Sequence, residues 1–230
     1  MLAVVLNGYG GPEVLTVQQL PDLVPGAEEL LVEVAATALN RADLMQRSGR
    51  YPQPGPRPQH EIPGLEFAGR VTAIGNRVSA FSPGDEVMGI LSGGGYASQV
   101  TIHERQAIPV PNGIALADAA AIPEVWLTAW DALVLQGDLA PGGTALIHGG
   151  GSGVGTAGIQ LANWIGAKAV VTCSAGKVAR CLSSAPPPPW TIAMVTRWPR
   201  CARYPVVGAQ TWCSTSSAGR TWTSTLMRWR

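Results

Sequence analysis

A glycine-rich segment between two apolar stretches limits the possible folds more than any other part of the chain. The run Thr144–Ile147 follows the turn signal at residues 141–143, and Gly149–Gly155 holds five glycines in seven residues. The stretch Val154–Ile165 then has helical length. Glycine reaches positive φ without a Cβ clash, and a helix N-terminus offers free N–H groups and partial positive charge. The segment therefore predicts a strand, a loop and a helix that bind a pyrophosphate.

A second apolar run, Ala169–Thr172, begins about 20 residues after the start of the glycine loop, as a parallel βαβ dinucleotide unit requires. A strict G-x-G-x-x-G spacing at Gly153, Gly155 and Gly158 falls one turn too far into the helix to carry the prediction alone. A glycine-rich hairpin loop is the alternative, but the helix-length stretch argues against it. The order of the parts predicts a Rossmann, doubly wound parallel sheet, which is an α/β fold.

Charge is distributed unevenly along the 230 residues, although the formal net charge is only +1. All 15 acidic residues lie at or before Asp138, while residues 181–230 contain six Arg and no Asp, Glu or Lys. By subtraction, residues 1–180 carry 10 basic and 15 acidic side chains, a net charge of −5. This mildly acidic body gives no reason to expect nucleic acid as its partner. With 46% hydrophobic residues, the chain can fill a sizeable core.

Neither a membrane span nor a secretory signal is expected. The start Met1–Leu6 has no basic residue before its apolar run, so it reads as a first strand of a cytoplasmic protein. The uncharged stretch Leu139–Ala167 contains nine glycines and is too weakly hydrophobic to span a bilayer. The four cysteines, at positions 173, 181, 201 and 213, form no C-x-x-C pair, which favours neither a disulfide framework nor a zinc site.

Residues 1–118 carry the signals of a small all-β domain. Short apolar runs alternate with proline and glycine turns, and four of them are Leu2–Leu6, Leu30–Ala35, Ala68–Ile74 and Glu86–Ile90. The exception is Asn40–Arg47, a predicted helix whose apolar side would be Leu44 and Met45. The loop Ser48–Pro63 is rich in proline, and long loops of this kind are more often functional than idle.

The signal becomes helical after residue 115. Pro123 suits a first helical turn, and Gly137 suits the end. Between them, apolar residues recur at i, i+3, i+4 and i+7, and they are Trp126, Ala129, Trp130 and Leu133. This spacing predicts a helix with one buried face.

Six segments, taken in order, resemble the zinc-free quinone oxidoreductases, a branch of the medium-chain dehydrogenase/reductase superfamily. They are Asn40–Arg47, Gly49–Pro52, Pro63–Gly69, Gly93–Ala97, Ala119–Ala129 and Ser152–Ala157. The resemblance covers roughly residues 1–180. It implies a GroES-like β domain with the substrate pocket (1–118), then the first part of an NADP-binding Rossmann domain (119–180). It also implies NADPH and a quinone or enone in the cleft between the domains, and a homodimer.

Zinc-dependent relatives of this branch place a Cys near Asn40 and a Gly-His-Glu where this chain has Gly64-Leu65-Glu66. Without a thiolate or imidazole there, alcohol chemistry driven by a Lewis acid has no metal ligands. The sequence therefore predicts no metal site.

The resemblance assigns the acceptor pocket to Asn40 and Tyr51. An amide can hydrogen-bond a carbonyl oxygen, and a tyrosine can stack on a flat ring or donate its O–H. Hydride transfer to an electron-poor quinone needs mainly positioning, so no catalytic triad is expected. The structural alternative is that Asn40 only caps the short helix and Tyr51 only packs against prolines.

Cofactor contacts are expected from two places. Ser152, Gly153, Val154 and Gly155 would present backbone N–H groups to the pyrophosphate, a role compatible with close helix–strand packing by these glycines. Thr128 matches a position near the nicotinamide ribose, although a threonine on an amphipathic helix is commonly a neutral surface residue.

The end of the second Rossmann strand indicates which dinucleotide is preferred. NAD-specific units place an Asp or Glu there, which would repel a 2′-phosphate. This chain has Thr172–Lys177 instead, with no acid, so Ser174 and Lys177 can bind the 2′-phosphate and favour NADPH. A solvated surface lysine is the alternative. His148, at the end of the first strand, is given no proton-transfer role.

The tail at 181–230 no longer resembles the family. It is basic and rich in Trp, Pro, Ser and Thr, with no sustained period of 2 or 3.6, and we expect it to be poorly ordered. An altered reading frame, giving a truncated and impaired or non-catalytic isoform, is the favoured interpretation. Binding of single-stranded nucleic acid by charge and stacking is the other.

Overall fold

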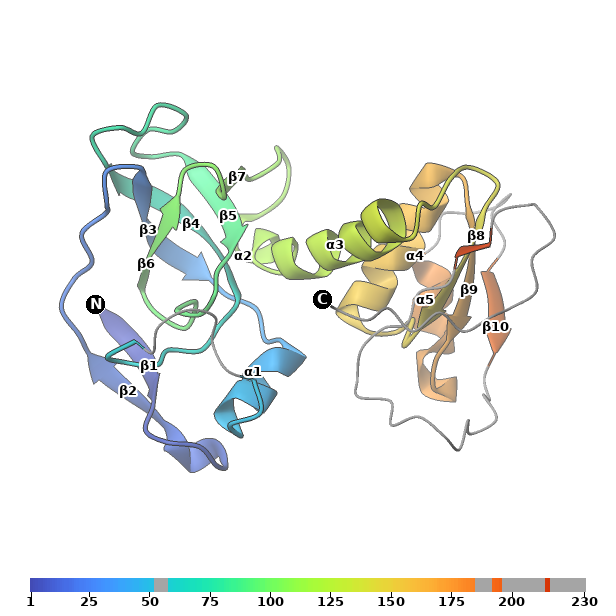
Figure 1. Ribbon diagram of the computed structural model, residues 1–230, viewed down its shortest axis with the longest axis horizontal. Helices are drawn as coiled ribbons and strands as arrows, with labels where there is room; N and C mark the ends of the chain where they lie inside the picture. The colour runs from blue at the N-terminus through green and yellow to red at the C-terminus, as the bar shows by residue number, and fades with distance from the viewer. Residues whose placement is uncertain (52–57, 185–191, 196–213, 216–230) are drawn as a thin grey trace. The chain divides into compact units, whose positions relative to one another are not determined.

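The computed structural model describes residues 1–51, 58–184, 192–195 and 214–215. The chain divides into two compact units, unit 1 (Met1–Glu124) and unit 2 (Val125–Arg230), which are described separately (Figure 1). The division falls inside helix α3 (Pro123–Trp130), six residues after the expected boundary at 118.

Unit 1 is built from two antiparallel sheets. The larger has the order β6-β3-β4-β5-β7, and the smaller pairs β1 with β2. The strands are β1 (Leu2–Leu6), β2 (Leu15–Gln19), β3 (Glu29–Ala36), β4 (Glu66–Ile74), β5 (Glu86–Ile90), β6 (Gln99–His103) and β7 (Ile108–Pro109). The helical segments are η1 (Pro12–Val14), α1 (Arg41–Arg47) and α2 (Leu116–Ala119). The four strands predicted by name are confirmed, as is the helix at α1.

Alternation along the strands explains the main core of unit 1. On β3, Leu30 and Val32 are buried while Glu33 is exposed, which is the period-2 pattern of a sheet with one covered face. They pack with Phe67 of β4 and Val87 of β5 in one apolar cluster. This rigid sheet fixes the end of β3 and the start of β4, between which α1 lies in sequence.

The predicted apolar side of α1 is wrong. Leu44 is 51% exposed, whereas Asp43 and Gln46, three residues apart on one helix face, are buried. The reason is tertiary, because polar side chains from distant segments meet this face: Tyr96 bonds to Asp43, and Glu61 bonds to Gln46.

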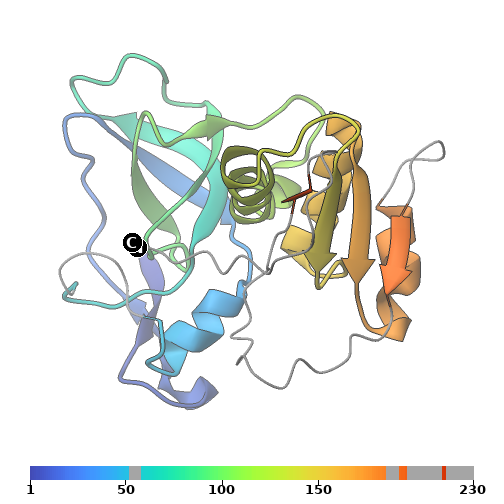
Figure 2. The same ribbon diagram turned by 45° about the vertical axis from the view of Figure 1, so that its right-hand side comes forward.

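Unit 2 contains the predicted strand, loop, helix and strand. They are β8 (Thr144–His148), α4 (Gly153–Ile165) and β9 (Lys168–Thr172), and β8 and β9 pair in parallel. Figure 2 shows these strands side by side with β10 (Ile192–Val195), which extends the parallel sheet beyond β9. The sheet order is β10-β9-β8-β11, where β11 (Ser214–Thr215) pairs antiparallel to β8. The Rossmann prediction is confirmed as a partial, mixed α/β domain.

Regular structure extends past the predicted end of this domain at residue 180. After β9 come η3 (Ala175–Lys177) and α5 (Val178–Ser183), so the first residues of the predicted tail are helical. Strands β10 and β11 also fall within residues 181–230, the predicted tail. The rest of the tail, like residues 52–57 of the proline-rich loop, lies outside the described residues.

The helix that begins unit 2 departs from the predicted periodicity. Ala129 and Leu133 are buried as expected, but Trp130 is 40% exposed. A π-helical segment, η2 (Asp131–Gln136), follows α3 directly after Trp130. None of the described helices is long and apolar enough to cross a bilayer.

Candidate functional site

A buried carboxylate joins three segments of unit 1. Glu66, at the first position of β4, is 1% exposed. Its Oε1 accepts a hydrogen bond from Nδ2 of Asn40 at 2.8 Å, and its Oε2 accepts one from the backbone N–H of Glu124 at 2.8 Å. Burial raises the pKa of Glu66, although these two hydrogen bonds oppose the shift. The start of α1, the start of β4 and the start of α3 therefore converge on one carboxylate.

A second buried carboxylate lies beside the first. Oδ2 of Asp43 accepts hydrogen bonds from the phenol of Tyr96 and from the backbone N–H of Asn40, both at 2.6 Å. Burial, followed by the charge and hydrogen bond of Asp43, raises the pKa of Tyr96 well above its usual range. Tyr96 therefore remains a protonated donor at neutral pH. We call Asn40, Asp43, Glu66 and Tyr96 the polar cluster.

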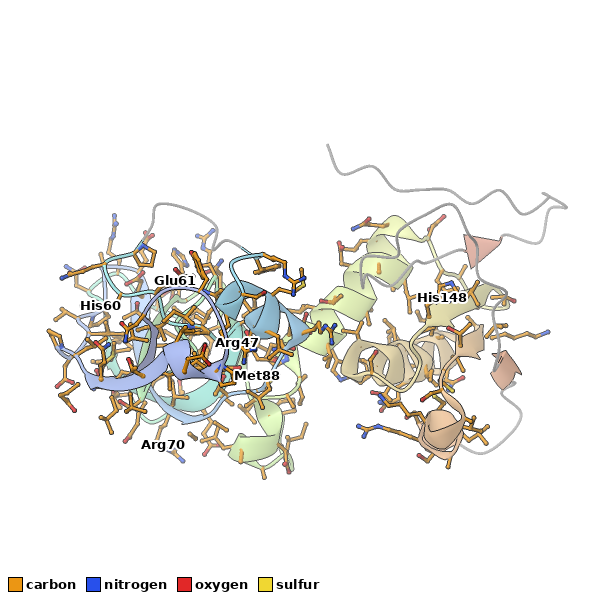
Figure 3. All side chains as sticks on the ribbon, turned by 90° about the horizontal axis from the view of Figure 1, so that it is seen from below. Arg47, His60, Glu61, Arg70, Met88 and His148 are labelled. Atoms are coloured by element: carbon orange, nitrogen blue, oxygen red, sulfur yellow. The ribbon has the colours of Figure 1, made fainter. Side chains whose placement is uncertain are left out.

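The adjacent face of α1 is held by a further carboxylate. Nε2 of Gln46 donates to Glu61 at 3.2 Å, and the hydroxyl of Tyr9 donates to the other oxygen of Glu61 at 3.2 Å. Figure 3 labels Glu61 among the side chains of unit 1. These bonds fix the rotation of α1 about its axis and so the direction of Asn40 at its N-terminus.

A cavity of about 450 Å³ lies against the polar cluster within unit 1. Its wall is mostly apolar, with Leu39 and residues of β1 and β3, and Tyr96 belongs both to this wall and to the cluster. Thr37, also in the wall, donates its hydroxyl to the backbone carbonyl of Glu66 at 2.7 Å. An apolar wall with a few placed polar groups, at this volume, is typical of a small-molecule pocket.

The two residues predicted to contact the hydride acceptor lie in different surroundings. Asn40 belongs to the polar cluster, as both the capping and the pocket interpretations allow. Tyr51 follows α1 and is 38% exposed, and within the described ranges no hydrogen bond connects it to Asn40 or Glu66.

Sequence reasoning missed Asp43 and Tyr96 as site residues, and took Glu66 only as part of a motif. A signal was present for Asp43, since an acid and an amide three residues apart share one helix face.

The glycine loop of unit 2 is too tight for other residues. A Cβ on Gly155 would lie 2.3 Å from the carbonyl oxygen of Gly149, which is well inside van der Waals contact. Ser152 caps α4, and its Oγ accepts from the N–H of Gly155 at 3.0 Å. Ser152 and Gly153 are exposed, while Val154 and Gly155 are buried. The loop thus presents the N-terminus of a 13-residue helix at the carboxyl end of β8, where dinucleotide phosphates bind.

The ends of β8 and β9 are tied together beneath this loop. Nδ1 of His148 lies 3.0 Å from Oγ1 of Thr172, and the backbone N–H of Gly150 donates to the Thr172 carbonyl at 3.0 Å. Burial lowers the pKa of His148, which is labelled in Figure 3, so the imidazole is neutral at pH 7. A neutral ring in this structural bond agrees with the absence of an assigned proton-transfer role.

The other predicted cofactor residues border the same loop. A Cβ on Gly151 would lie 2.7 Å from Cδ of Lys177, so the lysine stem runs along the loop. Lys177 and Ser174 are exposed. A Cβ on Gly153 would lie 2.8 Å from Val125, and Thr128 is one turn further along α3 on that face. The structure therefore brings both groups of predicted residues to one end of unit 2.

No group of three or more His, Cys, Asp or Glu side chains that could hold a metal ion occurs in the described part of the chain.

Comparison with known proteins identifies the architecture. Residues 26–112 match the family model of the alcohol dehydrogenase GroES-like domain. The chain thus carries a GroES-like domain similar to that of the medium-chain dehydrogenases/reductases. Among the curated proteins similar to this chain, the human synaptic vesicle membrane protein VAT-1 homolog is 37% identical over 159 residues. The match covers 68% of this chain and 40% of that protein, so the chain spans well under half the length of this relative.

Solved structures give the same assignment. The Escherichia coli quinone oxidoreductase complexed with NADPH superposes with a TM-score of 0.74 at 30% identity, over 84% of this chain and 58% of that one. The CurK enoyl reductase superposes with a TM-score of 0.77 at 30% identity, over 86% of this chain and 60% of that one. The structural neighbours of the chain therefore include a quinone oxidoreductase and an enoyl reductase.

Proposed function

We propose that the chain descends from an NADPH-dependent reductase of quinones or enones, in which hydride passes from the nicotinamide to the acceptor without a metal. The observation that carries the proposal is the hydrogen bond from Asn40 to the buried Glu66 beside an apolar cavity. An apolar cavity for a flat acceptor, next to a polar cluster that orients one amide, suits such a reaction better than it suits a structural role. Within the superfamily, the sequence segments resemble the tumour-suppressor-inducible quinone oxidoreductase most, and we propose that branch.

The glycine loop offers backbone N–H donors that suit the phosphates of the cofactor. The first N–H groups of a helix have no partner within the helix, and Ser152 satisfies only that of Gly155. The N–H of Ser152 donates to the Gly149 carbonyl at 2.8 Å. Of the predicted set Ser152–Gly155, the N–H groups of Gly153 and Val154, with the helix dipole, would therefore hold the pyrophosphate, and Thr128 would contact the nicotinamide ribose. Ser174 and Lys177 would hold the 2′-phosphate, which favours NADPH over NADH. When bound, NADPH supplies the hydride.

Asn40 would orient the acceptor. An ionised carboxylate only accepts hydrogen bonds, so Glu66 bonds the amide nitrogen of Asn40 and fixes the orientation of that amide. The second N–H of the amide therefore has a fixed direction. That N–H would donate to the acceptor carbonyl, whose oxygen gains negative charge as hydride arrives. Tyr51 would cover the flat ring.

A second candidate is a non-catalytic isoform that binds the cofactor weakly, because the sequence after residue 180 no longer resembles the family. Under either proposal we place the protein in the cytoplasm. We also propose that this chain does not form the homodimer known in the family.

The test combines binding and turnover on the full chain. NADPH binding is followed by its fluorescence, and quinone-dependent NADPH oxidation by absorbance. Turnover supports the reductase, and NADPH binding without turnover supports the non-catalytic isoform. If NADPH does not bind, both proposals are wrong.

A further inference from the structure

Thr172, the last residue of β9, joins the end of the sheet to the start of the glycine loop. The parallel register pairs it with His148, the last residue of β8. Its Oγ1 lies 3.0 Å from Nδ1 of His148 and, at 3.4 Å, accepts a longer hydrogen bond from the backbone N–H of Gly149. Its backbone carbonyl accepts the N–H of Gly150 at 3.0 Å. One residue therefore holds the first two glycines of the loop, through its side chain and through its backbone.

The contacts continue from these glycines to the N-terminus of α4. Gly149 has a φ of +71°, and its carbonyl accepts the N–H of Ser152 at 2.8 Å, which closes a turn. A Cβ on Gly155 would lie 2.3 Å from the same carbonyl oxygen, so the helix packs directly against it. The two N–H groups proposed to hold the pyrophosphate follow Ser152 directly. A displacement of Gly149 is therefore passed on to these donors.

We propose that Thr172 is a positioning residue, whose hydroxyl sets the conformation of the glycine loop and so the direction of the N–H groups of Gly153 and Val154 toward the pyrophosphate. The pyrophosphate part of this inference rests on the proposed function. The contact of Thr172 with the loop does not.

This role needs the hydroxyl of Thr172 and not merely the shape of its side chain. Valine is also β-branched and suits a strand equally well, and the two residues before Thr172 in β9 are valines. Valine offers neither a donor nor an acceptor. A hydroxyl has one hydrogen and two lone pairs, so it can accept from the Gly149 N–H and donate to a neutral imidazole at the same time. The strand does not require threonine at this position, but the side-chain contacts with the loop do.

The proposed role makes a distinctive demand on cofactor binding. The pyrophosphate is common to NADPH and NADH, so loss of the Thr172 hydroxyl should weaken both cofactors by the same factor. Lys177, in contrast, is proposed to contact the 2′-phosphate, which only NADPH has. The ratio of the two affinities therefore separates a residue that positions the loop from one that contacts the 2′-phosphate.

The experiment compares Thr172→Val with Thr172→Ser, which keeps a hydroxyl, in the full chain. Thr144→Val is the matched control, because Thr144 lies at the opposite end of β8 and its hydroxyl makes no hydrogen bond within the described residues. The Kd for NADPH and for NADH is measured by fluorescence. Amide hydrogen exchange of residues 149–155 is measured without any cofactor, and tryptophan emission follows the unfolding of unit 2.

We expect Thr172→Val to raise the Kd for both cofactors by the same factor, about three- to tenfold, which corresponds to the loss of about one hydrogen bond. Exchange of the loop should become faster in the same variant. Thr172→Ser and Thr144→Val should stay close to the unmodified chain in both assays, and the unfolding of unit 2 should be alike in the two valine variants.

Four results would overturn the inference. They are unchanged loop exchange in Thr172→Val, failure of Thr172→Ser to restore the loop, a loss of affinity confined to NADPH, and an equal response of Thr144→Val, which would trace the effect to the whole sheet. Loss of the folded unit 2 in Thr172→Val alone would contradict the local role in the same way. If the unmodified chain binds neither cofactor, the proposed function fails, and loop exchange in the Val and Ser variants still decides whether Thr172 positions the loop.

Discussion

Replacing Glu66 tests whether its buried carboxyl group holds the polar cluster together. Each oxygen of Glu66 accepts one hydrogen bond, from Asn40 and from the backbone of Glu124. In Glu66→Ala both donors lose their acceptor, and each such loss costs about 1–3 kcal/mol, so unit 1 should lose about 2–6 kcal/mol of unfolding free energy. That is a large share of the roughly 5–15 kcal/mol that holds a typical domain.

Glu66→Gln should cost much less, because it keeps the shape and one acceptor. The backbone N–H of Glu124 cannot turn, so the new side-chain oxygen remains with it and the new amide nitrogen faces Asn40. Asn40 can turn its own amide and offer oxygen. The change therefore puts about one neutral hydrogen bond at risk, so the expected cost is about 0.5–1.5 kcal/mol.

The cost of Glu66→Gln should depend on pH. Because the pKa of Glu66 is raised in the fold, its stabilising contribution is complete below its unfolded pKa of about 4.3 and is lost as pH rises through the folded pKa. Gln does not titrate. The advantage of the unmodified chain over Glu66→Gln should therefore be greatest in acid and shrink toward neutral pH.

The assay must report on unit 1 alone. All eight tryptophans lie at or after Trp126, so their emission follows unit 2. Each chain is equilibrated in urea at several pH values and given a brief deuterium pulse at one fixed pH, and mass spectrometry reads peptides from residues 1–51 and 58–124. Glu33→Gln, on an exposed position of β3, is the control and should change little. Equal costs for Gln and Ala at position 66 would refute the argument that the side chain of residue 66 holds both donors, and an advantage that grows with pH would refute the raised pKa of Glu66.

Three further predictions concern cofactor binding, turnover and the stability of unit 2. Lys177→Glu should erode the preference for NADPH over NADH in fluorescence titrations, and equal affinities in the unmodified chain would contradict the assignment. Asn40→Ala and Tyr51→Ala, in a chimera carrying the C-terminal part of a full-length relative, should lower quinone reduction with NADPH affinity nearly intact; unchanged kinetics would return both residues to structural roles. Gly155→Ala should destabilise unit 2 by about 1–3 kcal/mol in tryptophan-monitored unfolding, because its Cβ would meet the Gly149 carbonyl, while Gly176→Ala, with nothing within 4 Å, should not.

The parts of the fold that were predicted from the sequence are those with local causes. The glycine loop, the parallel strands beside it and the alternating strands of unit 1 follow from backbone freedom and period-2 burial, which a single segment displays. The buried face of α1 could not be predicted in this way, because Asp43 is buried only by virtue of Tyr96, 53 residues away in the chain.

The polar cluster also bears on which acceptors the proposed reaction can use. A metal ion polarises a carbonyl by several kcal/mol, whereas a neutral hydrogen bond such as one from Asn40 contributes about 0.5–1.5 kcal/mol. Asn40 also has its amide nitrogen bonded to a carboxylate, which makes the remaining N–H a weaker donor to a second oxygen. The protein would thus contribute orientation more than electrophilic activation. Such a site suits acceptors that are already electron-poor, such as quinones and enones, and the apolar wall beside Tyr96 suits their flat rings. Reduction of a simple ketone would need more polarisation than these residues supply.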